Sequence, residues 1–122
     1  MSEETKIQKP KCVACEVGAE ALSPEVIQDH LAGASGWQLI DDGKKIRKDW
    51  EVRNFAAAME FFNAIAEIAE DRGHHPDLHL VSYRKVTIVI WTHAIGGLSQ
   101  YDFELAAAID QLPVKLPKGK AK

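Results

Sequence analysis

The chain has 122 residues, which is the length of one domain and too short for two ordinary ones. Hydrophobic residues make up 46% and charged residues 27%, a globular composition that argues against a disordered chain, a collagen or a coiled coil. The net charge of −3 is too close to neutral for a protein whose main partner is nucleic acid. Because no apolar stretch can span a bilayer and residues 1–11 lack the apolar centre of a signal peptide, we expect a cytoplasmic protein without a membrane partner.

The two ends of the chain show little sign of regular structure. Residues 1–22 have no sustained periodicity, and we expect an irregular N-terminal arm there. Cys12 and Cys15 form a CxxC pair without the second ligand pair of a zinc site, so we interpret them as reduced cysteines of this arm, with a zinc site as the alternative. The basic residues 113–122 predict a flexible tail, which either keeps the protein in solution or contacts an acidic partner. A single domain is left at residues 23–112.

The first half of this domain has the pattern of a helix followed by a β-hairpin. The Ser-Pro-Glu sequence at 23–25 combines an N-cap hydroxyl, a proline at the first helical position and an acidic residue, which predicts a helix start. Glycines within 33–36 end this helix. Residues 37–40 are expected to form a strand, the Asp-Gly sequence within 41–44 predicts a tight turn, and residues 46–52 form the return strand.

The second half repeats this order with a longer helix. Asn54 caps that helix, its apolar residues recur every three or four positions, and Gly73 ends it. The next hairpin is predicted as a strand over 78–83, a turn at 84–85 and a strand over 86–91. Both faces of this hairpin are mostly apolar, so we expect a second subunit to cover one of them.

The last predicted helix begins at Ser99 and runs to about residue 112. Asp102 stands three residues after Ser99, where the acid of a capping box is found. The elements therefore follow the order α-β-β-α-β-β-α, with hairpin connections between the strands. This order predicts an α+β fold in which helices pack on one face of a four-stranded antiparallel sheet.

Four of the five histidines, His74, His75, His79 and His93, lie within twenty consecutive residues. Imidazole titrates near neutral pH, so such a cluster suggests proton transfer or metal binding. His74 and His75 are in the loop that leaves the long helix, and His93 follows a predicted strand. If that strand pairs beside the loop, these three imidazoles meet at one pocket, where Glu70 can orient His74 or share its proton. The alternative is a polar loop without a function.

Other kinds of site find less support in the sequence. The histidine spacing does not match the usual zinc motifs, and no cysteine lies near the cluster, so no metal site is expected. Walker, Rossmann and nucleophile-elbow motifs are absent from the sequence. His30 is interpreted as a helix residue that is exposed or partly buried.

The histidines belong to a longer spaced pattern. It consists of Glu70-Asp71-Arg72-Gly73-His74-His75-Pro76, then Tyr83, then Thr92-His93, then Gly97-Leu98-Ser99 and Asp102. This pattern resembles the signature of the pterin-4a-carbinolamine dehydratases. The resemblance covers about residues 20–112, and the sequence is identified as a member of that family.

The resemblance implies a small lyase that needs neither a cofactor nor a metal. Such an enzyme removes water from 4a-hydroxytetrahydropterin and yields quinonoid dihydropterin. By family match, His74, His75 and His93 line the pterin pocket, and Glu70 supports His74. We expect His74 and His93 to transfer protons and His75 to bind mainly the substrate.

The resemblance has three further implications. Pro76, Thr92 and Asp102 match positions at which substrate contact is expected, although for Asp102 helix capping is expected at least as strongly. Assembly into a homodimer or homotetramer through paired sheet edges is implied as well. The family also includes non-catalytic relatives, namely RuBisCO assembly factors without the histidine pair and dimerisation cofactors of a homeodomain transcription factor. The histidines retained here favour the enzyme.

Overall fold

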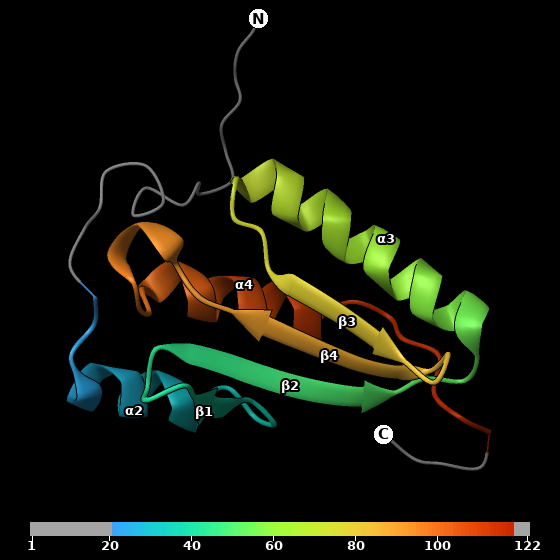
Figure 1. Ribbon diagram of the computed structural model, residues 1–122, viewed down its shortest axis with the longest axis horizontal. Helices are drawn as coiled ribbons and strands as arrows, with labels where there is room; N and C mark the ends of the chain where they lie inside the picture. Colours follow the sequence, from blue (N-terminus) through green and yellow to red (C-terminus); the bar gives the residue numbers. More distant parts are fainter. Residues whose placement is uncertain (1–20, 119–122) are drawn as a thin grey trace, which may run out of the picture.

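The computed structural model describes residues 21–118 of the chain (Figure 1). The predicted α+β class and order of elements are confirmed, while Cys12 and Cys15 lie outside the described residues. The helices are α2 (Pro24–Ala32), α3 (Phe55–Arg72), the short 3₁₀ helix η2 (His93–Ile95) and α4 (Gln100–Asp110), and the strands are β1 (Gln38–Ile40), β2 (Lys45–Glu51), β3 (Asp77–Val81) and β4 (Lys85–Ile90).

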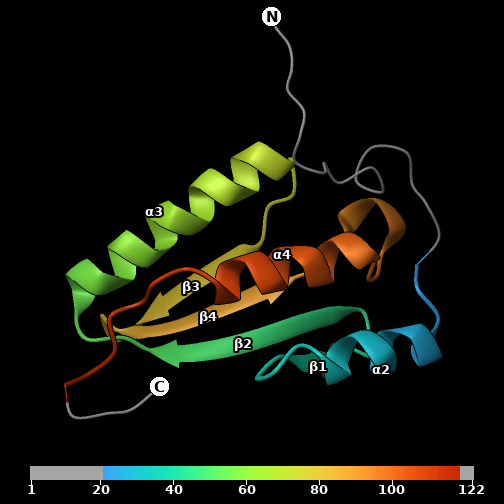
Figure 2. The ribbon, with the colours of Figure 1, turned by 180° about the vertical axis from the view of Figure 1, so that it is seen from behind.

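The four strands form one antiparallel sheet in the order β1-β2-β4-β3. Ile46 pairs with Ile90 and Leu78 with Ile88, so that apolar side chains of neighbouring strands share one face. The helix α4 lies behind the sheet in Figure 1 and in front of it in Figure 2. Within residues 21–118, α2, α3 and α4 all contribute to the core on this face, which includes Ile27, Ala57, Ala58, Phe61, Ile65, Leu105, Ala106, Ile109 and the strand residues Ile46, Val86, Ile88 and Ile90. The helices therefore pack on one face, as predicted.

Side-chain caps fix the beginnings of the helices where the sequence predicts them. Ser23 Oγ accepts a hydrogen bond from the backbone N–H of Val26, and Asn54 Oδ1 accepts one from that of Ala57 at 2.9 Å. The helix α3 ends at Gly73, which has a φ of 66° in the left-handed region that favours glycine. The chain leaves α3 in a new direction at this residue, immediately before the histidine pair.

The turn of the second hairpin differs from the prediction. It lies at Ser82 and Tyr83, which have φ values of 53° and 56°, and not at residues 84–85. Positive φ at both central residues is what a two-residue hairpin of type I′ requires. Serine and tyrosine give no signal for it, because Gly, Asn and Asp are the residues that usually adopt this conformation.

Residues beyond the last helix also pack against the domain. The carbonyl of Lys115 accepts a hydrogen bond from the backbone N–H of Arg53 at 2.8 Å, and that of Leu116 accepts one from Arg53 Nε at 3.1 Å. Val114 packs against the core. These contacts extend the packed part of the chain past residue 112, after which the sequence predicted a flexible tail.

The second face of the sheet carries mixed side chains. Asp77 and His79 are exposed on β3, and Thr87 on β4 donates a hydrogen bond to Asp49 on β2 at 2.6 Å. The apolar side chains among them include Val89, which is 9% exposed, and Val81, which is 60% exposed. The prediction that both faces of the second hairpin are apolar is therefore wrong for β3. Among residues 21–118, no helix has the length and apolar character needed to cross a membrane.

Candidate active site

The strand register brings the histidine loop and the end of β4 to the same end of the sheet. Asp77, the first residue of β3, pairs with Val89 near the end of β4. The strands are antiparallel, so the loop 74–76 that precedes β3 lies beside residues 91–93 that follow β4. Figure 1 shows this loop and the 3₁₀ helix η2 at one end of the molecule. The pairing of β3 with β4 thus places the loop that carries His74 and His75 near the residues that follow β4.

His74 is buried and paired with a carboxylate. Its side chain is 4% exposed, and its Nε2 lies 2.6 Å from Oδ1 of Asp102, which is fully buried at 0% exposure. The left-handed Gly73 directs the chain so that His74 leaves the surface of α3 and enters the interior. A buried carboxylate beside an imidazole holds the ring in one orientation.

Asp102 is the centre of a buried hydrogen-bond network. Its Oδ2 accepts bonds from Thr92 Oγ1 at 2.8 Å and from the backbone N–H of Ser99 at 2.7 Å, and the latter completes the capping box of α4. Thr92 Oγ1 also lies 3.1 Å from Ser99 Oγ. The start of α4 favours the negative charge through the helix dipole. Asp102 therefore caps α4 and orients His74 at the same time.

His75 lies at the surface with a different partner. Its Nε2 is 2.8 Å from Oε2 of Glu70, and the two side chains are 60% and 78% exposed. The expectation that Glu70 supports His74 is wrong. After the helix ends at Gly73, His74 turns inward to Asp102, so His75 is the residue left beside the carboxylate on the last turn of α3. Pro76 follows and restricts His75 to an extended backbone.

His93 is the first residue of η2, and its side chain is exposed. Its ring centroid lies 3.9 Å from that of Trp91, with the ring planes tilted by 42°. The three predicted imidazoles therefore comprise one buried ring held by a carboxylate and two rings accessible to a ligand. Such a set can donate one proton and accept another without a metal. Among residues 21–118, no group of three or more His, Cys, Asp or Glu side chains could hold a metal ion.

The family model for pterin 4 alpha carbinolamine dehydratase matches residues 20–112. The chain belongs to this family. An Arabidopsis thaliana relative, pterin-4-alpha-carbinolamine dehydratase 2, mitochondrial, is 46% identical over 86% of the chain and 58% of its own length. A relative from Dechloromonas aromatica with the same enzyme name is 39% identical over 92% of the chain and 97% of its own length.

Solved structures of the dehydratase family share the fold. A Brucella melitensis protein described as a transcriptional coactivator/pterin dehydratase superposes with a TM-score of 0.70 at 25% identity, over 75% of the chain and 96% of that protein. A pterin dehydratase-like RuBisCO assembly factor of the alpha-carboxysome gives a TM-score of 0.53 at 20% identity, over 62% of the chain and 86% of that protein. The second likeness shows the fold alone.

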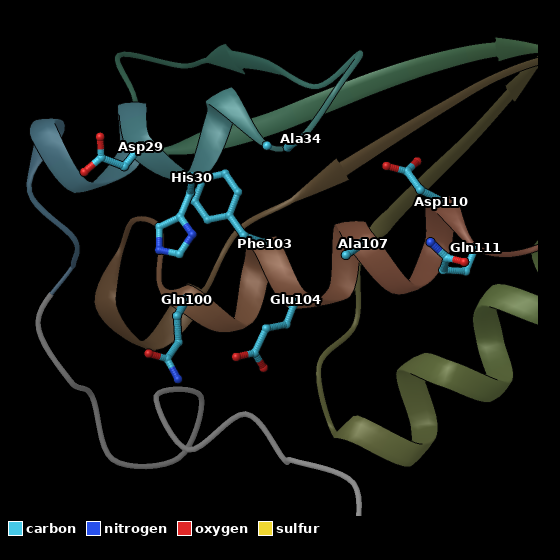
Figure 3. A pocket seen from close by; sticks show the side chains of 10 residues that line it. Asp29, His30, Ala34, Gln100, Phe103, Glu104, Ala107, Asp110 and Gln111 are labelled. Carbon is cyan, nitrogen blue, oxygen red and sulfur yellow. The ribbon is translucent and has the colours of Figure 1, made fainter.

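A cavity of about 560 Å³ lies between α2 and α4 (Figure 3). His30 stacks on Phe103 there, with ring centroids 4.7 Å apart and planes 9° from parallel. His30 is thus partly buried, within the range expected for it. The residues that line this cavity do not include any of the three histidines of the dehydratase motif, so we separate it from the candidate active site.

Two parts of the site were not predicted from the sequence. Ser99 was expected only as a helix cap, yet its hydroxyl also joins the network around Asp102. Trp91 was assigned to a strand, and its contact with His93 was not foreseen. The available signal was an aromatic residue two positions before a candidate histidine, which is too common to be informative alone.

Proposed function

We propose that this member of the dehydratase family eliminates water from 4a-hydroxytetrahydropterin to give quinonoid dihydropterin. The observation that carries the proposal is the buried His74–Asp102 pair at the same end of the sheet as the exposed His75 and His93. The relatives named as carbinolamine dehydratases support the reaction type. The substrate is a small pterin, and the reaction as proposed uses no metal and no cofactor.

The reaction needs a proton donor and a proton acceptor. The C4a–O bond breaks, the hydroxyl takes up a proton to leave as water, and the N5–H proton passes to a base while the N5–C4a double bond forms. We assign these two transfers to His74 and His93, because an imidazole can serve as acid or base near neutral pH. The Asp102 carboxylate, 2.6 Å from His74 Nε2, holds the imidazole in one orientation for the transfer. His75 binds the substrate.

The remaining motif residues act around these imidazoles. Thr92 and Asp102 are fully buried and bonded to each other, so we assign them to holding His74 and not to substrate contact. Glu70 orients His75 through their 2.8 Å contact. Pro76 fixes the backbone between His75 and β3. Of the three residues Pro76, Thr92 and Asp102, it is the one that we still propose to contact the substrate.

A direct assay tests the proposed reaction. The substrate is generated in place, and the formation of quinonoid dihydropterin is followed with and without the purified protein, because this substrate also dehydrates spontaneously. We expect a rate above the uncatalysed one that rises in proportion to protein concentration and persists in a metal chelator. A rate equal to the uncatalysed one at every protein concentration would refute the enzyme, and loss of activity in chelator would indicate a metal site.

We also propose that the protein is a homo-oligomer, a dimer or tetramer. The strand β3 stands at the edge of the sheet, and Val81 at its end and Tyr83 in the following turn are 60% and 57% exposed. An unpaired edge with apolar side chains favours pairing with another chain. Light scattering should give a mass of two or four 13.5 kDa subunits, and the mass of a single subunit at micromolar concentration would contradict the assembly.

The cytoplasm is the proposed location of the reaction. The Arabidopsis relative is described as mitochondrial, which gives the alternative location. Cell fractionation with an antibody against the protein tests the cytoplasmic location, and recovery in an organelle fraction would contradict it.

A further inference from the structure

The three histidines are restrained in different ways. His74 and His75 each have a carboxylate within 2.6–2.8 Å of Nε2. Within the part of the chain from 21 to 118, the His93 side chain has no hydrogen bond or ion pair, and its ring contact is with Trp91 at 3.9 Å between centroids. An exposed imidazole on a short 3₁₀ helix is otherwise free to rotate. The orientation of this ring therefore depends on the indole.

Trp91 is itself held from the neighbouring strand. It directly follows β4, and extending the pairing of Ile46 with Ile90 by one residue places Lys45 opposite it. The Lys45 ammonium lies 4.4 Å from the centroid of the indole, a cation–π distance, and Lys45 Nζ also lies 3.3 Å from Oδ2 of Asp41. The indole is thus in contact with a side chain of β2 as well as with His93.

The indole N–H of Trp91 makes no hydrogen bond in the described part of the chain that would stabilise the side chain in this position. Its Nε1 is buried and, among residues 21–118, has no hydrogen-bond partner. A buried donor without a partner destabilises the folded state, so the N–H group brings no gain here. The aromatic face, which contacts Lys45 and His93, is the part of the side chain that makes the observed interactions.

We propose that Trp91 is a positioning residue that fixes the His93 ring for proton transfer through its aromatic face. The proposal rests on the proposed function, because it assigns a purpose to the orientation of His93. Small displacements of a reacting group are costly for proton transfer, which requires hydrogen-bond distance and alignment. Trp91 acts through His93 and is not expected to touch the substrate.

Two variants separate the aromatic face from the bulk of the side chain. Trp91→Leu keeps an apolar side chain but removes the ring, and we expect kcat to fall roughly 10- to 100-fold with little change in KM. Trp91→Phe keeps a smaller aromatic face and removes the unpartnered N–H, so it should retain more of the kcat than the Leu variant. A Phe variant as slow as the Leu variant, or a Leu variant as fast as the wild type, would overturn the proposal.

A double variant tests whether Trp91 works through His93. In the His93→Ala background, Trp91→Leu should have no further effect on kcat, because the group that it positions is already missing. A further fall of tenfold or more would show that Trp91 acts by another route and would overturn the proposal.

NMR spectroscopy tests the contact between Trp91 and His93 without measuring catalytic activity. Aromatic rings shift the NMR signals of nearby protons, so the His93 Cε1 proton should move in Trp91→Leu and less in Trp91→Phe, while the His79 signal stays in place. An unchanged His93 signal in a folded Leu variant would overturn the contact in solution. A wild-type protein without dehydratase activity would refute the proposed function, whereas full activity with an inactive Trp91→Phe variant would refute the positioning role alone.

Discussion

The buried and exposed parts of the candidate active site are built by different interactions. On the buried side, the carboxylate of Asp102 receives hydrogen bonds from Thr92, Ser99 and His74, and each of these residues is at most 5% exposed. On the exposed side, His75 has a single surface ion pair and His93 a ring contact. The buried network belongs to the core and to the start of α4, whereas the exposed groups depend on pairwise contacts.

This difference predicts how changes in the two parts will behave. Removing a partner from the buried network leaves polar groups unpaired in the interior, so both folding and catalysis should suffer. Removing an exposed imidazole leaves nothing unpaired in the core, so activity should change while stability does not. The following variants test this separation, from the largest expected effect to the smallest.

Replacing Asp102 should have the largest effect. Asp102→Ala leaves the backbone N–H of Ser99, the hydroxyl of Thr92 and the His74 ring without their acceptor, and we expect the free energy of unfolding to fall by about 3–5 kcal/mol. Denaturant unfolding monitored by circular dichroism measures this loss. Asp102→Asn keeps an acceptor and should lose less. Equal stability of the wild type and the Ala variant would contradict the structural role of the network.

Replacing His75 should affect substrate binding without affecting folding. His75→Ala removes an exposed imidazole, and we expect KM to rise roughly tenfold, with a smaller change in kcat and an unchanged unfolding midpoint. His79→Ala is the matched control, because His79 is an exposed histidine on β3, away from the loop. A kcat loss as large as that of His93→Ala would assign proton transfer to His75 instead.

The smallest effect is expected from Asp49, outside the site. The hydrogen bond from Thr87 and the contact with Arg47 hold the pKa of the Asp49 carboxyl below its usual range, despite partial desolvation. A carboxyl with a lowered pKa in the folded state stabilises the protein above its unfolded pKa, and this stabilisation is lost as the pH falls through the folded value. The Asp49 side chain is 57% exposed, so the contribution should be only about 0.2–1 kcal/mol.

Unfolding by urea at two pH values measures this contribution. Asp49→Asn should be slightly less stable than the wild type at neutral pH, and the difference should shrink as the pH falls through the lowered pKa of the folded state, where the wild-type carboxyl also becomes protonated. A difference that grows on acidification would contradict the direction of the shift.

Local signals in the sequence were sufficient for most of the fold. Ser23, Asn54 and Ser99 cap the helices as predicted, because capping depends on a side chain and a backbone group only a few residues apart. The tight turn at Ser82 and Tyr83 was missed by two residues, since neither side chain signals positive φ. The boundaries of strands that depend on long-range pairing were shifted by one residue or more.

The sequence predicted which residues form the candidate site, but it did not predict which carboxylate pairs with which histidine. The sequence identifies His74, His75, His93 and Asp102 as a group because their spacing matches a family motif. Which carboxylate faces which imidazole depends on the left-handed turn at Gly73, which sends His74 inward to Asp102 and leaves Glu70 with His75. Helical spacing alone favoured the wrong pair, because it assumes that the helix continues through His74.

The most direct test of the proposed mechanism is the dehydratase activity of the double variant His74→Ala, His93→Ala. Each single change should lower kcat by about 10²–10⁴, the usual range for loss of general acid–base catalysis. The double variant, compared with the uncatalysed rate and with a chelator present, should therefore show almost no enzymatic acceleration. It should be less stable than the wild type, because His74 belongs to the buried network, so circular dichroism at the assay temperature checks that it is still folded. Activity equal to that of the wild type would show that these imidazoles do not transfer the protons.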